Sequence, residues 1–148
     1  MKTLLWTLLA IAAGAVLPVQ AGLNARMGRA VSDPVYGAFI SFVVGGIALF
    51  TYCLLAKVDL TQINQARSEN WSVWTAGLLG AFYITMVILL VPRIGVALTF
   101  SLIILGQLGL SLLLDQYGLL GLPVHVINLP RVLGLLLIIG GVLLIRSF

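Results

Sequence analysis

The sequence predicts an all-α integral membrane protein with five transmembrane helices. Hydrophobic residues make up 61% of the 148 residues and charged residues only 8%, whereas charged residues form about 25% of a typical soluble domain. The mean hydropathy is +1.20. Since one transmembrane helix needs about 20 apolar residues, the chain has room for five helices in one membrane domain, 1–148. We expect these helices at about 3–23, 34–56, 71–91, 94–114 and 131–146.

The first predicted helix contains a proline at membrane depth. Pro18 has no backbone N–H and its ring presses on the carbonyl group of Gly14, so we expect a bend near Gly14. The same segment resembles a secretory signal, because an apolar run follows Lys2 and small residues surround Ala21. Four further apolar runs follow, and we therefore interpret this segment as a retained first helix.

The second predicted helix begins with a clear signal. Ser32-Asp33-Pro34 is typical of a helix cap with proline in the first helical position. Gly37, Ser41 and Gly45 then recur at spacings of four. Small residues in this pattern let another helix approach closely, and we assign them to an interface between two copies of the chain.

The connections differ in character. The segment 57–70 is polar and is expected to lie on the membrane surface, followed by Trp71 and Trp74 as interfacial anchors. Pro92-Arg93 predicts a tight turn between the third and fourth helices. The segment 115–130 contains several glycines and prolines and is expected to form an interfacial loop with little regular structure.

The fifth predicted helix carries paired glycines. Gly134 and Gly141 are seven residues apart and share one helix face. This stripe suits the pairing of two helices, although glycine is also generally frequent in transmembrane helices. The two halves of the chain do not resemble one another, so an inverted partner would have to be a second copy.

The eight basic residues divide equally between the two sides of the predicted membrane topology. One side holds Lys2, Lys57, Arg67 and Arg131, and the other holds Arg26, Arg29, Arg93 and Arg146. Lysine and arginine normally collect in cytoplasmic loops and fix the orientation. An equal division gives no such instruction and predicts insertion in both orientations, although chance alone produces a tie in roughly one chain in four under this rule.

Several classes of function are disfavoured. The isoelectric point of 9.7 does not indicate nucleic-acid binding, because the basic residues are scattered at helix ends and form no patch. Cys53 is the single cysteine, and no Cys/His cluster suggests a metal or another cofactor. His125 has no acidic or cysteine neighbour in the sequence. Without a nucleophile and base or paired acids, we do not expect an enzyme.

Six stretches together resemble the short five-span YdcZ-like group of the drug/metabolite transporter superfamily. They are residues 17–26, 77–83, 91–95, 106–111, 115–118 and 131–141. The resemblance implies a bacterial inner-membrane protein that forms half of a ten-helix inverted-repeat fold and pairs with an antiparallel copy of itself. The fifth helix also looks like the dimerising helix of small multidrug resistance transporters. Those relatives carry a glutamate in the first helix, whereas this first helix has no acidic residue, so exchange of cationic drugs for protons is not expected.

Polar side chains at membrane depth tend to face protein or water-filled cavities. Gln20 and Asn24 share a face just beyond Pro18, and either bind a polar solute or form hydrogen bonds between helices. Gln107 and Ser111 form a second polar stripe, which continues to the interface.

That stripe ends at Asp115, which opposes the helix dipole and needs a cationic partner, for which Arg131 is the candidate. The pair either contributes to gating or simply holds the loop. Arg93 either reaches the lipid headgroups or draws anions towards the mouth of the transporter. Tyr83 and Trp6 line a cavity or pack as ordinary aromatic residues.

The sequence therefore predicts a small-molecule transporter that works by alternating access as a dual-topology, antiparallel homodimer in contact with membrane lipid. The predicted site combines Gln20 and Asn24 with Gln107 and Ser111 near the midplane. Because these are amides and a hydroxyl, a neutral polar or anionic solute is favoured over a cation. The alternative is a nontransporting membrane subunit that assembles with or stabilises another membrane protein.

Overall fold

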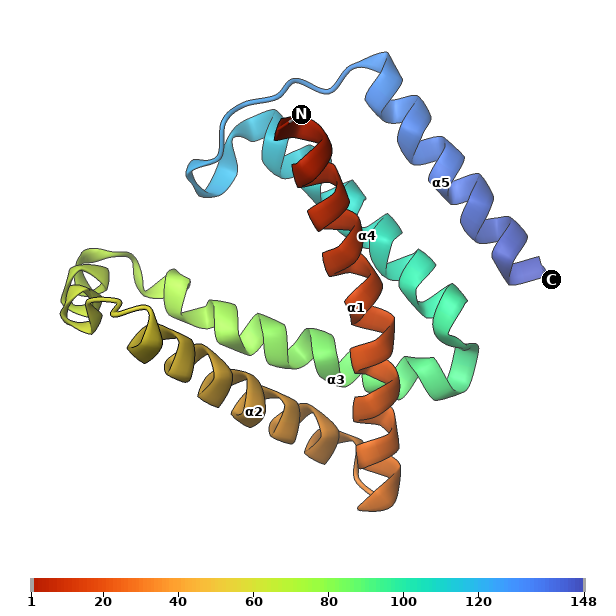
Figure 1. Ribbon diagram of the computed structural model, residues 1–148. Coiled ribbons are helices and arrows are strands. Elements are labelled where there is room, and N and C mark those ends of the chain that lie inside the picture. Colours follow the sequence, from red (N-terminus) through yellow and green to blue (C-terminus); the bar gives the residue numbers. More distant parts are fainter. Residues whose placement is uncertain (1, 148) are drawn as a thin grey trace. The chain divides into compact units, whose positions relative to one another are not determined.

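The computed structural model describes residues 2–147, without the side chain of Lys2, and contains no strand in this range (Figure 1). Five of its helices are long and apolar enough to cross a membrane, which confirms the predicted fold class. They are α1 (Lys2–Ala30), α2 (Pro34–Leu55), α3 (Ala76–Ile94), α4 (Val96–Tyr117) and α5 (Leu129–Ser147). Three short 3-10 helices, η1 (Leu60–Ser68), η2 (Trp71–Thr75) and η3 (Leu119–Gly121), lie in the connections.

The chain divides into two compact units, Met1–Arg93 and Ile94–Phe148. In the first unit, α2 and α3 run alongside one another, and α1 crosses them near the start of α2 (Figure 1). In the second unit, α4 packs against α5.

The turn between α1 and α2 is built as the sequence predicts. The Asp33 carboxylate accepts a hydrogen bond from the Val35 N–H group at 2.9 Å, and Pro34 opens the helix. The Asp33 N–H group in turn donates to the carbonyl group of Gly28 at 2.9 Å. Ser32 adopts a left-handed conformation with φ of 58°, which reverses the chain within a few residues.

Two glycines let the backbones of α1 and α2 meet directly. A Cβ atom added to Gly28 would lie 2.9 Å from the Cα atom of Pro34, and one added to Gly37 would overlap the carbonyl oxygen of Asn24. Another helix does approach Gly37, as the small-residue pattern predicts, but this helix is α1 of the same chain. Gly37 thus makes a contact within the first unit, and its assignment to an interface between copies stays a prediction.

The core of the first unit lies where α3 meets this helix pair. Ala25 of α1 and Ala38 of α2 are buried together with Ile84 and Ile88 of α3, and Tyr83 packs against them. The two alanines leave room for the larger side chains of α3, so the three helices interlock by shape. Such packing stabilises helices in lipid, where water does not drive association.

Several helix ends differ from the predicted bounds: α3 begins at Ala76, after η2, and α4 continues to Tyr117. The segment after residue 23, expected as a polar exit, remains helical to Ala30. The tight turn expected at Pro92-Arg93 is wrong, because α3 continues through Pro92 to Ile94. Pro92 has no N–H group to donate to the carbonyl group of Ile88, so the last turn of α3 lacks that hydrogen bond. The chain turns instead at Gly95, whose φ of 82° is a conformation that favours glycine.

The polar segment 57–70 is organised around Asp59. Its carboxylate accepts hydrogen bonds from the Thr61 hydroxyl at 2.6 Å and from the Thr61 N–H group at 3.0 Å. These bonds hold the pKa of Asp59 below its usual value, the hydroxyl having the larger effect. Because the folded pKa is lowered, the cap is formed at neutral pH and weakens as the pH falls through that pKa.

We predict that Gly37→Ala destabilises the detergent-solubilised protein by about 1–3 kcal/mol, because the new methyl group must displace the backbone of α1. Gly45→Ala is the matched control, since a Cβ atom at Gly45 meets no atom within 4 Å; its effect should stay within about 1 kcal/mol. Thermal unfolding followed by circular dichroism measures both. Equal midpoints for the two variants would contradict the close approach of α1 and α2.

Candidate functional site

A polar contact joins α1 and α2 at membrane depth. The side-chain amide of Gln20 donates a hydrogen bond from Nε2 to Oγ of Ser41 at 3.3 Å. Gln20 therefore forms the interhelical hydrogen bond that the sequence left open as one alternative. Ser41 faces α1 of its own chain through this bond, and its assignment to an interface between copies stays a prediction.

Two cavities of the first unit share this contact. The cavity towards α3 has a volume of about 390 Å³, and its polar lining comes from Gln20, Ser41 and Tyr83. The second cavity lies between α1 and α2, has a volume of about 440 Å³, and includes Asn24 together with Gln20 and Ser41. No acidic or basic side chain lines either cavity. Both are mainly apolar, with a few amide and hydroxyl groups at defined places.

Two buried polar atoms beside these cavities have no hydrogen-bond partner in the described part of the chain. They are Nδ2 of Asn24, a residue only 8% exposed, and the hydroxyl oxygen of Tyr83. Burying an unpaired polar group costs about 1–3 kcal/mol. Such groups are expected where a ligand, water or a second protein surface completes the bonding.

The remaining predicted residues of the first unit have different surroundings. Gly45 lines both cavities. Trp6 is exposed on the first half of α1 and lines neither cavity. The α-helix is continuous through Pro18, and the space around Gly14 is open; the bend at Gly14 stays a prediction.

The polar stripe of α4 belongs to the second unit. Gln107 and Ser111 are both exposed there, and the Ser111 hydroxyl donates to the backbone carbonyl of Gln107 at 2.6 Å. The serine hydroxyl is thus partly satisfied within its own helix, while the Gln107 amide remains available.

At the end of this stripe, Asp115 and Arg131 form the expected ion pair. The Arg131 guanidinium donates to the Asp115 carboxylate at 3.1 Å and to the His125 carbonyl at 3.2 Å. The Asp115 carbonyl accepts the His125 N–H group at 2.9 Å, and Oε1 of Gln116 accepts the Ile127 N–H group at 2.6 Å. Gln116 was not predicted from the sequence to hold the loop, although a polar side chain at a helix end was an available signal.

The glycines of α5 lie beside grooves between α4 and α5. Gly134 lines a groove of about 240 Å³ with Leu108 and Leu112, and Gly141 lines one of about 360 Å³ with Ser101. A Cβ atom at either glycine would meet nothing within 4 Å. Their role in pairing two copies stays a prediction.

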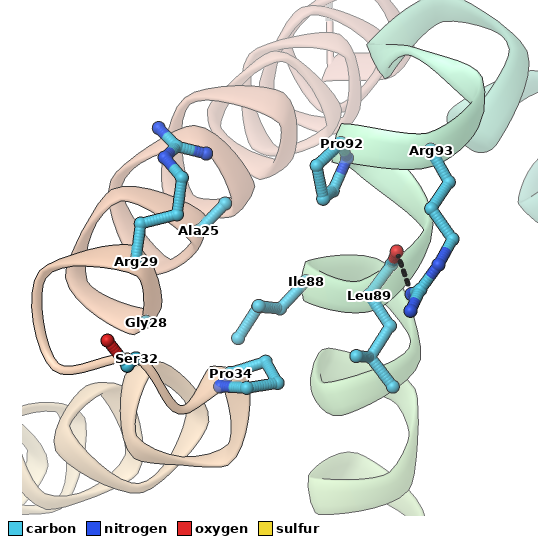
Figure 2. Close-up of a pocket in the computed structure, with 9 residues that line it drawn as sticks. All are labelled: Ala25, Gly28, Arg29, Ser32, Pro34, Ile88, Leu89, Pro92 and Arg93. Carbon is cyan, nitrogen blue, oxygen red and sulfur yellow. Dashed lines mark hydrogen bonds between the residues drawn. The ribbon is translucent and has the colours of Figure 1, made fainter.

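A third cavity of the first unit, about 480 Å³ in volume, lies at the α1–α2 turn and includes Arg29, Ser32 and Arg93 (Figure 2). The Arg93 guanidinium donates to the Leu89 carbonyl at 2.6 Å. From the sequence, Arg29 was counted only in the charge division and Ser32 only in the helix cap, and neither was predicted to line a cavity. Their signal was that both lie near helix ends on the same predicted side of the membrane as Arg93. Among the described residues, no cluster of His, Cys, Asp and Glu could hold a metal ion.

Comparison of the chain with known proteins identifies the family to which it belongs. Residues 5–144 match the model of the family described as "Putative inner membrane exporter, YdcZ". The chain belongs to the YdcZ family. It is 30% identical over 137 residues to the inner membrane protein YdcZ of Escherichia coli K12, covering 92% of this chain and 91% of that relative. No solved structure matches the chain.

Family membership and the five apolar helices make this YdcZ family member a multi-pass protein of the inner membrane. They also support the predicted class of membrane transporter.

We predict that Asp115→Asn loosens the segment 122–128, because the Arg131 guanidinium loses its carboxylate partner. Both side chains are about one third exposed, so solvent screening limits the stabilisation by this ion pair to at most about 1 kcal/mol. Its loss should therefore speed amide exchange in the segment by at most about fivefold. Hydrogen exchange at His125 and Ile127 measures it. Asp59→Asn, in the first unit, is the control and should leave the exchange rates of these two amides unchanged. If Asp115→Asn also leaves those rates unchanged, the ion pair does not hold the loop.

Proposed function

We propose that this YdcZ family member exports a small neutral polar or anionic solute by alternating access, as a pair of oppositely oriented copies. The observation that carries the proposal is the pair of buried, unpartnered groups beside the cavities, Asn24 Nδ2 and the Tyr83 hydroxyl. In a family described as exporters, a passing solute is a natural partner for such groups.

The chemistry of the lining favours the proposed solute class. Asn24 offers amide N–H donors, Tyr83 offers a hydroxyl, and Gln20 offers both a donor and an acceptor. No carboxylate lines either cavity, so an organic cation would be desolvated there without a counter-charge. A neutral polar group or an anionic group can instead accept hydrogen bonds from all three side chains.

The contact between Gln20 and Ser41 provides a simple exchange of partners. Its length of 3.3 Å lies beyond the usual range of 2.7–3.2 Å for an N–H···O bond, so little energy is lost when Gln20 turns to a solute. In the proposed cycle, the solute replaces Ser41 as the partner of Gln20. The polar stripe of α4, Gln107 and Ser111, is proposed to supply further contacts.

Two observations support an inverted second copy as part of the proposal. The described residues form five helices long and apolar enough to cross a membrane, an odd number, and the sequence has no internal repeat, so one copy cannot form an inverted pair by itself. Its basic residues divide equally between the two ends of the helices. Membership of the wider drug/metabolite transporter superfamily, in which inverted halves form one transporter, is proposed with it.

We predict that Tyr83→Phe lowers solute flux about tenfold, because it removes one buried hydrogen bond of about 1.4 kcal/mol to the passing solute. Tyr52→Phe is the matched control, since Tyr52 is 65% exposed, and it should leave flux unchanged. Purified protein is placed in liposomes together with a mixture of small neutral and anionic metabolites outside them, and mass spectrometry measures which metabolites the liposomes take up. Uptake of none by the unaltered protein would favour the nontransporting subunit instead.

The proposed pair requires the chain to insert into the membrane in both orientations. Two added lysines in the segment 57–70 should bias insertion towards one orientation and abolish flux. Two added lysines beside Ser32, in the α1–α2 turn, should bias insertion the opposite way, with the same loss. Co-expression of the two biased chains should restore flux, because each supplies the orientation that the other lacks. Full flux from either biased chain alone would exclude the antiparallel pair.

A further inference from the structure

The cavity at the α1–α2 turn combines positive charge with an apolar wall. Arg29 extends from α1, Ser32 lies in the turn, and Arg93 stands on α3 (Figure 2). The cavity lies where α1 and α3 end and α2 begins. In a protein whose helices span the membrane, this level is the interface with the lipid headgroups.

The two arginines have no carboxylate partner among the described residues. The only ion pair among the described residues joins Arg131 to Asp115, and both of these residues belong to the second unit. Arg93 uses one N–H group for the Leu89 carbonyl, and a guanidinium has further donors. The acidic residue of the turn, Asp33, does not line the cavity and caps α2 instead.

The rest of the lining is apolar. It consists of Ala25, Gly28, Pro34, Ile88, Leu89 and Pro92. Figure 2 shows Ile88 projecting from α3 towards the turn and Pro92 towards α1, with the Arg29 and Arg93 side chains on either side of them and their guanidinium groups pointing apart. A freely soluble anion gains nothing from this wall, whereas a phosphate group that carries an acyl chain can place its charge at the arginines and its chain against Ile88.

We propose that this cavity is a binding site for the phosphate group of an anionic phospholipid, with Arg29 and Arg93 as the cationic ligands and Ser32 as a hydroxyl donor. Arginine suits this role because its planar guanidinium forms paired hydrogen bonds with phosphate oxygens, and basic pockets between transmembrane helices bind anionic headgroups. Zwitterionic lipids bind more weakly, because the arginines repel their ammonium group. The site does not depend on the proposed solute pathway.

The test uses the purified full chain in neutral detergent, titrated with phosphatidylglycerol or with phosphatidylethanolamine and followed by native mass spectrometry. The unaltered protein is expected to bind phosphatidylglycerol more tightly. Arg29→Gln with Arg93→Gln should weaken that binding about tenfold or more. Arg26→Gln with Arg146→Gln removes the same charge from residues that do not line the cavity and should change the binding less than threefold.

Three outcomes would overturn the proposal. The first is equal binding of phosphatidylglycerol by both double variants, and the second is equal binding of the two lipids by the unaltered protein. The third is displacement of phosphatidylglycerol by millimolar inorganic phosphate, which would assign the site to a free anion. Circular dichroism melting of both double variants verifies folding, and single substitutions of Arg29 and Arg93 keep the test decisive if the double variant unfolds.

Discussion

The first unit depends on the direct contact of two helix backbones. Gly37 lies against the carbonyl group of Asn24, and Gly28 lies against Pro34, at distances that leave no room for a side chain. This contact fixes how α1 and α2 face one another, and it brings Gln20 opposite Ser41 one turn further along α2. In lipid, such close packing replaces the hydrophobic driving force available to soluble proteins.

The same contact also buries a polar side chain that the fold does not satisfy. Asn24 belongs to the turn of α1 that Gly37 approaches, and among the described residues its amide nitrogen has no hydrogen-bond partner, nor does the hydroxyl group of Tyr83 on α3. A protein that needed only a stable helix bundle would be better served by apolar residues at both positions. Their cost is understandable if the unpaired donors serve a solute, which is consistent with an exporter family.

Sequence reasoning located the features that short-range chemistry determines. Asp33 capping α2 and the pairing of Asp115 with Arg131 both follow from local patterns of charge and helix ends. It did not identify α1 as the helix that approaches Gly37, because the glycine spacing permits close approach by any helix and does not specify which. The turn was placed at Pro92 instead of Gly95 because proline marks a helix end, whereas α3 continues to Ile94 and the positive φ of Gly95 separates it from α4.

The proposed transporter is a pair of oppositely oriented copies, and the orientation of a single chain tests this most directly. The C-terminus can be fused to a reporter active only in the cytoplasm or to one active only in the periplasm, at native expression level. Because the basic residues divide equally between the two ends of the helices, we expect both fusions to be active to within about a factor of three. Activity of one fusion alone would contradict the antiparallel pair.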